Sequence, residues 1–100
     1  MNLLPSEAIK IGKEGMEQWW EDFFDNPHDI HACSALGAAY LGWCKVTGEV
    51  INPYITYEAL IEKLDFGNWP YEKVTTLIRW NKEEKLTFDQ IIDKLDKWGI

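Results

Sequence analysis

The sequence predicts an all-α fold: a compact single-domain bundle of four to five short helices spanning residues 1–100. Three observations support this prediction. A chain of 100 residues has the usual size of one domain. Apolar residues recur at helical spacing in several short segments, which are separated by Gly, Pro or Asn and by brief connections. No internal repeat, low-complexity segment or long linker divides the chain, so short helices packed in a bundle are the expected architecture.

The first predicted helix opens at Ser6, directly after Pro5. Gly12 and Gly15 weaken its end because glycine disfavours helix interiors. Residues 17–25, here called the acidic–aromatic segment, follow and fit either a helix or an ordered loop.

The central helix is predicted to begin at Asn26-Pro27, with Asn as N-cap and Pro at the first helical position, and to end at Gly48. It contains Gly37 and Gly42, each of which costs about 1 kcal/mol relative to alanine. Close approach of another helix or aromatic ring would offset this cost. The alternative is a ligand lying against the exposed backbone.

Residues 49–55 predict an irregular connection, after which Thr56 caps a third helix. A fourth helix is predicted to start at Asn-Trp-Pro (68–70) and to stop near Asn81. Asn81 is expected to be its C-terminal cap. Trp80 is expected to anchor the corner that leads to the last helix.

The last helix has the strongest local signature in the chain. Thr87 and Gln90 have the spacing of a capping box, and Leu86 and Ile91 that of a hydrophobic staple. Gly99 is expected to end this helix.

Composition restricts the classes of function. The formal net charge is −7, from 17 acidic and 10 basic residues, which disfavours direct binding to nucleic acid. The first residues lack a secretory signal, and no apolar run is long enough to span a membrane. Two cysteines without an export signal fit a reducing cytoplasm, so a cytoplasmic protein is expected.

A candidate metal site must be considered, because zinc uses imidazole and thiolate ligands. The candidate ligands are His28, Asp29, His31, Cys33 and Cys44. On a helix, however, His28 and His31 diverge by about 60°, and no second pair of ligands is present. On a continuous helix the two cysteines would lie about 16 Å apart, too far for a disulfide. We therefore expect free buried thiols, no metal and no cofactor.

The acidic–aromatic segment is the most informative stretch for function. Six acids and no Lys or Arg occur between residues 14 and 29, with four aromatic residues among them. Aromatic side chains surrounded by carboxylates are typical of a surface that binds a basic protein. The alternative is an amphipathic helix with its rings in the core, although two adjacent aromatic pairs cannot all point inward. The predicted partner-binding residues are Glu17, Trp19, Trp20, Glu21, Asp22, Phe23, Phe24 and Asp25.

Catalytic motifs are not apparent in the sequence. There is no phosphate-binding glycine loop, no nucleophile elbow and no carboxylate pair beside a candidate His base. The chain is therefore predicted not to be an enzyme.

Taken in order, several residues resemble a family of small phage and bacterial proteins of unknown function. The family has Gly and Gln near an N-terminal aromatic segment, then a C-x-L-G-A helix, then W-N-D and a Thr-capped helix. The matching residues are Gly15, Gln18, the segment Cys33 to Ala38, Trp80, Asn81 and Thr87. The cysteine motif has one extra residue, Lys82 replaces the Asp, and Met16 replaces a Trp. The resemblance implies a phage origin and a helical fold, and it supplies no catalytic residues.

These observations favour a protein-binding module in the cytoplasm of an infected or host bacterial cell. Its expected partner is a host protein with a basic surface, such as a defence or nucleic-acid-binding protein, which it would inhibit by imitating nucleic-acid charge. Two alternatives remain: a small-ligand binder, for example of a nucleotide signal, and a structural or oligomerising phage protein.

Overall fold

The centre of the fold is helix α2 (Ala35–Thr47), whose residues 35–42 are all buried. The computed structural model describes residues 3–63 and 71–99, and for residues 71–73 the backbone alone. In this part of the chain α2 is accompanied by four helices and two very short strands. They are α1 (Pro5–Gly12), β1 (Glu17–Gln18), β2 (Ala32–Cys33), α3 (Tyr57–Lys63), α4 (Tyr71–Lys82) and α5 (Phe88–Lys97).

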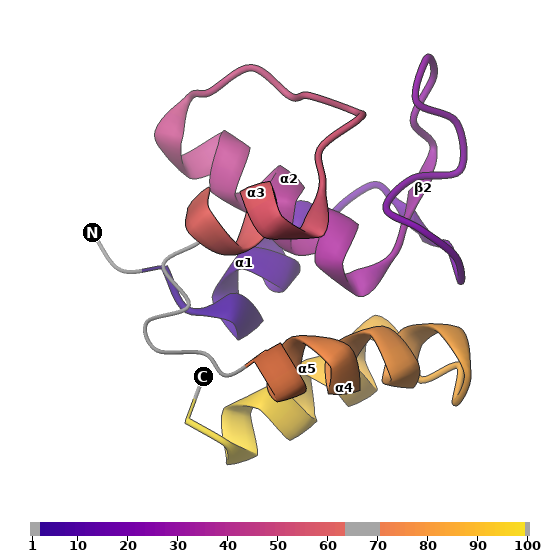
Figure 1. The fold of residues 1–100 in the computed structure, drawn as a ribbon, viewed down its shortest axis with the longest axis vertical. Coiled ribbons are helices and arrows are strands. Elements are labelled where there is room, and N and C mark those ends of the chain that lie inside the picture. The colour runs from indigo at the N-terminus through magenta and orange to yellow at the C-terminus, as the bar shows by residue number, and fades with distance from the viewer. Residues whose placement is uncertain (1–2, 64–70, 100) are drawn as a thin grey trace.

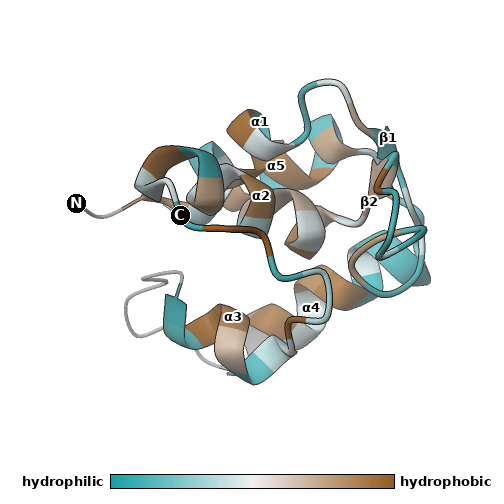
Figure 2. Cartoon of the chain, turned by 90° about the horizontal axis from the view of Figure 1, so that it is seen from above, coloured by the Kyte–Doolittle hydropathy of each residue, from teal (hydrophilic) through white to brown (hydrophobic). Residues whose placement is uncertain are grey.

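The helices pack around α2 to form one bundle, which confirms the predicted all-α fold. Helix α1 contacts both α2 and α5, and α4 contacts α2 and α5. Figure 1 shows α4 and α5 together on one side of the molecule, with α2 and α3 on the other. Strands β1 and β2 pair in parallel, with Glu17 opposite Ala32, and lie at one end of the bundle. In Figure 2 the chain around these strands is largely hydrophilic, whereas hydrophobic residues gather on the helices.

Glycines allow unusually close contacts with α2. A Cβ atom on Gly42 would lie 1.9 Å from the Ala8 carbonyl oxygen of α1, and Gly12 meets the backbone of α2 in the same way. A Cβ on Gly37 would lie 2.3 Å from the carbonyl oxygen of Phe23. The helical glycines are therefore explained by close backbone packing, the first of the two predicted explanations.

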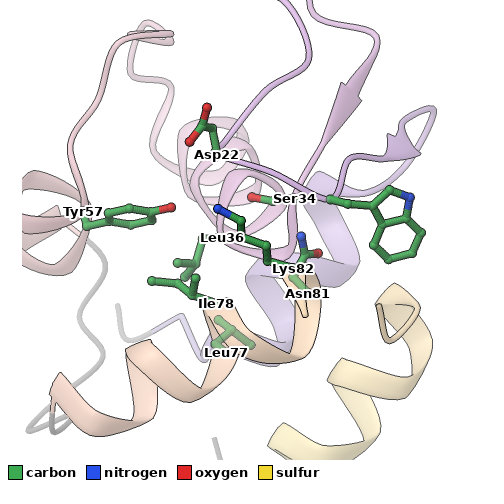
Figure 3. Close-up of a pocket in the computed structure, with 9 residues that line it drawn as sticks. Asp22, Ser34, Leu36, Tyr57, Leu77, Ile78, Asn81 and Lys82 are labelled. Atoms are coloured by element: carbon green, nitrogen blue, oxygen red, sulfur yellow. The ribbon is translucent and has the colours of Figure 1, made fainter. Parts of the chain in front are cut away.

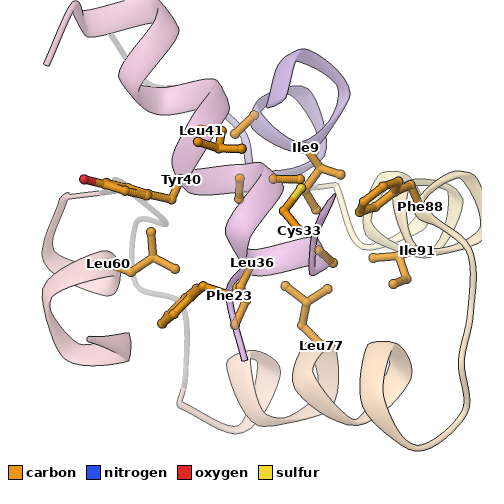
Figure 4. Packing of buried hydrophobic residues seen from close by; sticks show 14 of the residues in the cluster. Ile9, Phe23, Cys33, Leu36, Tyr40, Leu41, Leu60, Leu77, Phe88 and Ile91 are labelled. Carbon is orange, nitrogen blue, oxygen red and sulfur yellow. The ribbon is translucent and has the colours of Figure 1, made fainter. Parts of the chain in front are cut away.

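Every helix contributes side chains to the core, which Figure 4 shows around α2. Tyr40 is 1% exposed, and its hydroxyl accepts a 2.7 Å hydrogen bond from the backbone N–H of Asn52, so its one polar atom is satisfied. Leu60, Leu77 and Ile91 bring α3, α4 and α5 to the same core.

None of the helices within residues 3–63 and 71–99 has the length and apolar character needed to cross a membrane.

The predicted start of the central helix at Asn26-Pro27 is wrong. Helix α2 begins eight residues later, where Ser34 is the N-cap and its hydroxyl accepts a 3.1 Å hydrogen bond from Gly37 N–H. Asn26 instead uses its side-chain oxygen to accept from His28 N–H at 3.0 Å, which stabilises a local turn.

Other boundaries agree better with the sequence. Helix α1 begins at Pro5, one residue before the predicted start. The Thr56 hydroxyl accepts from Ala59 N–H at 3.2 Å, and Thr87 and Gln90 form the predicted capping box. Residues 49–55 contain no regular element, as expected. The predicted helix start at residues 68–70 lies outside the described residues.

Candidate functional site

The acidic–aromatic segment is extended and bent rather than helical, and its aromatic pairs separate. Phe23 and Phe24 are 9% and 6% exposed and belong to the core, whereas Trp19 is 36% exposed and Trp20 is half-buried. The chain bends at Asp22, whose φ of 43° lies in the left-handed region that Asp tolerates better than most residues. Phe23 and Phe24, predicted as partner-binding residues, are therefore core residues with little surface to offer a partner.

Three carboxylates remain beside the tryptophans. Glu17, Glu21 and Asp22 are exposed, and none forms an ion pair with any residue in the described ranges. Together with the two indoles they form the acidic–aromatic surface, which consists of Glu17, Trp19, Trp20, Glu21 and Asp22.

Asp25 is engaged in the fold instead. Its Oδ1 accepts backbone hydrogen bonds from Ala32 N–H at 3.0 Å and His31 N–H at 3.1 Å. These bonds, with Ala32 contributing most, hold the pKa of Asp25 below its ordinary value of 3.8. Asp25 therefore fixes the loop that leads into β2 and is not part of the acidic–aromatic surface.

Gln18 anchors the segment to the C-terminal half of the chain. Its Nε2 donates to Asn81 Oδ1 at 3.0 Å and to the Leu86 carbonyl at 2.7 Å. Its Oε1 accepts from Phe88 N–H at 2.8 Å, at the first residue of α5. All the hydrogen-bonding atoms of this amide are thus used to join β1 to the α4–α5 corner.

Asn81 completes this network from within α4, where it is 4% exposed. Its Oδ1 also accepts from Ala35 N–H at 3.1 Å, and its Nδ2 donates to the Trp19 carbonyl at 2.9 Å. The helix stops near Asn81 as predicted, but Asn81 is not its C-terminal cap, because α4 continues to Lys82 and Asn81 has no left-handed backbone conformation. Its side chain binds β1 and α2 instead. Trp80 beside it is buried, and its ring lies 4.9 Å from that of Trp98, which follows the last residue of α5 and does not lie at the corner.

A pocket of about 300 Å³ opens next to the acidic–aromatic surface, between the start of α2 and the end of α4 (Figure 3). Its apolar lining residues are Leu36, Leu77 and Ile78, and the aromatic residues Trp20 and Tyr57 line it as well. Its polar groups are Asp22, Ser34, Asn81 and Lys82.

Sequence reasoning identified only Trp20 and Asp22 among these residues as candidate binding residues. Ser34, Tyr57 and Lys82 come from three other segments with no common spacing, so no local pattern announces them. Their association depends on how α2, α3 and α4 pack.

The histidines and cysteines do not converge. His31 Nε2 lies 3.0 Å from the Asp29 carboxylate, and His28 Nε2 lies 3.1 Å from the Tyr54 hydroxyl. Cys33 and Cys44 are buried free thiols, and burial raises the pKa of Cys33 to about 12. Within residues 3–63 and 71–99, no three His, Cys, Asp or Glu residues are placed to hold a metal ion.

The residues that carry the family resemblance have structural roles in this fold. Gln18 and Asn81 form the polar network, and Thr87 caps α5 beside it. The resemblance itself stays a prediction. No protein-family model matches this chain, and no curated protein or solved structure matches it.

Proposed function

We propose that this chain is a protein-binding module that recognises a basic surface on a host protein and inhibits that protein by covering the surface. The observation that carries the proposal is the environment of Trp19. Its indole is 36% exposed, and it lies on the same short segment as three carboxylates that have no ion-pair partner in the described part of the chain.

The acidic–aromatic surface combines two properties of protein interfaces. Tryptophans supply large contact areas with few rotatable bonds and are frequent hot spots. Unpaired carboxylates attract a basic partner and accelerate its association. Within the chain, Lys85 Nζ already lies 5.2 Å from the Trp20 ring centre, the contact that a lysine or arginine of a partner would repeat.

The charge of the chain supports inhibition rather than direct nucleic-acid binding. With a net charge of −7, the domain repels phosphate, but it suits a protein surface that binds phosphate. The resemblance to small phage and bacterial proteins supports a host defence or nucleic-acid-binding protein as the partner.

The test compares three baits in affinity capture from a lysate of the cell in which the chain naturally occurs. They are wild type, the surface variant Glu17→Lys/Glu21→Lys, and the control variant Glu58→Lys/Glu62→Lys. The control reverses two exposed acids of α3, which have no ion pair in the described part of the chain, so both variants change net charge equally.

We expect a partner that wild type and control recover and the surface variant loses, with recovery falling steeply as salt is raised. Adding the wild-type chain should also displace nucleic acid from the purified partner. Equal recovery of every partner by all three baits would overturn the proposal.

A further inference from the structure

We infer that the pocket between α2, α4 and the acidic–aromatic segment is a binding site for a small amphoteric molecule with an apolar body, of the size and chemistry of an apolar amino acid. The inference is independent of the proposed protein-binding function. It rests on the pocket's size, on its apolar lining, and on the charged side chains of Asp22 and Lys82, which line the pocket but form no ion pair with each other.

The pocket has an apolar wall that can contact the apolar part of the ligand. Leu36, Leu77 and Ile78 form one wall, with the Tyr57 ring beside it in Figure 3, and Trp20 also lines the pocket. Tyr57 is held in place from behind, because its ring lies 4.6 Å from that of the buried Phe23. A volume of about 300 Å³ is at the lower end of ligand sites, which suits an amino acid better than a nucleotide.

A carboxylate fits the end of the pocket near α2. The Lys82 side chain and the Ser34 hydroxyl point toward the same region in Figure 3. Lys82 forms no ion pair with any described residue. Ser34 is 5% exposed, and its hydroxyl accepts from Gly37 N–H but donates to no residue within the described ranges. A buried hydroxyl with an unused proton and an unpaired ammonium are both donors for an anionic group.

An ammonium group fits beside Asp22. Asp22 lines the pocket with an unpaired carboxylate on a backbone held at positive φ. Burial, and then the charge of Asp22, raise the pKa of Tyr57, which agrees with that carboxylate facing the tyrosine hydroxyl. Asp22 would repel a phosphate group, so the one lysine does not make the pocket suitable for a nucleotide.

The experiment measures dissociation constants by NMR titration with three related probes. L-phenylalanine carries both charged groups, phenethylamine lacks the carboxylate, and 3-phenylpropionate lacks the ammonium. L-leucine with its corresponding amine and acid forms a second series, and AMP is included as a nucleotide.

Wild type should bind the amino acid at least about tenfold more tightly than either analogue, the loss expected for one charged hydrogen bond. Lys82→Met should weaken the amino acid and the acid but spare the amine. Asp22→Asn should weaken the amino acid and the amine but spare the acid. Lys45→Met, which removes a lysine outside the pocket lining, should change nothing.

The site would be refuted if neither amino acid bound, if AMP alone bound, or if either pocket variant weakened all three probes equally. Glu17→Lys/Glu21→Lys should leave amino-acid binding intact, because neither glutamate lines the pocket. Failure of this site is therefore distinguishable from failure of the proposed protein interface.

Discussion

Gln18 Nε2 donates a 3.0 Å hydrogen bond to Asn81 Oδ1, across 63 positions of sequence. This bond joins the short strand β1 to the last turn of α4, and Asn81 also holds the backbone of Trp19. The position of both tryptophans therefore depends on a buried polar network rather than on a helix of their own. Networks of this kind favour one arrangement because each unsatisfied member is costly.

Asn81→Ala should destabilise the fold by about 3 kcal/mol, because Ala35 N–H, the Trp19 carbonyl and the Gln18 amide lose a buried partner. Denaturant unfolding followed by tryptophan fluorescence measures this change. Asn26→Ala is the matched control: it removes one exposed hydrogen bond and should cost no more than about 1 kcal/mol. Equal effects of the two substitutions would argue against the network.

Gly42→Ala should destabilise the fold by about 2–3 kcal/mol although alanine is the better helix former. The added Cβ would meet the Ala8 carbonyl of α1 at 1.9 Å, so the two helices must separate. Gly15→Ala serves as comparison: its site at φ 74° is strained but open, and about 1 kcal/mol is expected. A thermal or denaturant melt decides, and a Gly42→Ala variant as stable as wild type would contradict the close packing of α1 on α2.

Stability should decrease in acid partly through Asp25. Its pKa is lower in the folded chain than the ordinary 3.8, so its stabilisation is complete above that value and is lost as pH falls through the folded pKa. Asp25→Asn should therefore flatten the pH dependence of the free energy of unfolding below about pH 4. The measurement is a series of urea titrations of both proteins from pH 2 to 7. If the free energy of unfolding depended on pH identically in wild type and Asp25→Asn, Asp25 would not contribute to the loss of stability in acid.

The sequence revealed features that depend on neighbouring residues and missed those that depend on distant ones. The Thr87–Gln90 capping box is local and was predicted correctly. Asn and Ser are both favourable N-cap residues, so Asn26 and Ser34 could each begin the central helix. The helix begins at Ser34 because residues 32–33 form strand β2, which pairs in parallel with β1. That pairing joins segments about 15 residues apart, so no helical periodicity indicates it.

The candidate site shows the same division. The two adjacent aromatic pairs correctly predicted that some of the four rings are exposed to solvent. They did not predict which rings, because the burial of Phe23 depends on its contact with Tyr57 in α3. The pocket could not be predicted, because Ser34, Tyr57 and Lys82 meet only after three helices pack.

The proposed protein interface depends on one division of the acidic–aromatic segment, in which the Trp19 indole faces outward and the phenyl rings of Phe23 and Phe24 face the core. Hydroxyl-radical footprinting read by mass spectrometry tests it directly, with each residue's oxidation rate normalised to that of the same residue in the urea-unfolded chain. Trp19 should keep much of its unfolded reactivity and Trp20 part of it, while Phe23 and Phe24 should be strongly protected. Protection of Trp19 equal to that of the two phenylalanines would contradict the outward-facing arrangement and with it the acidic–aromatic surface.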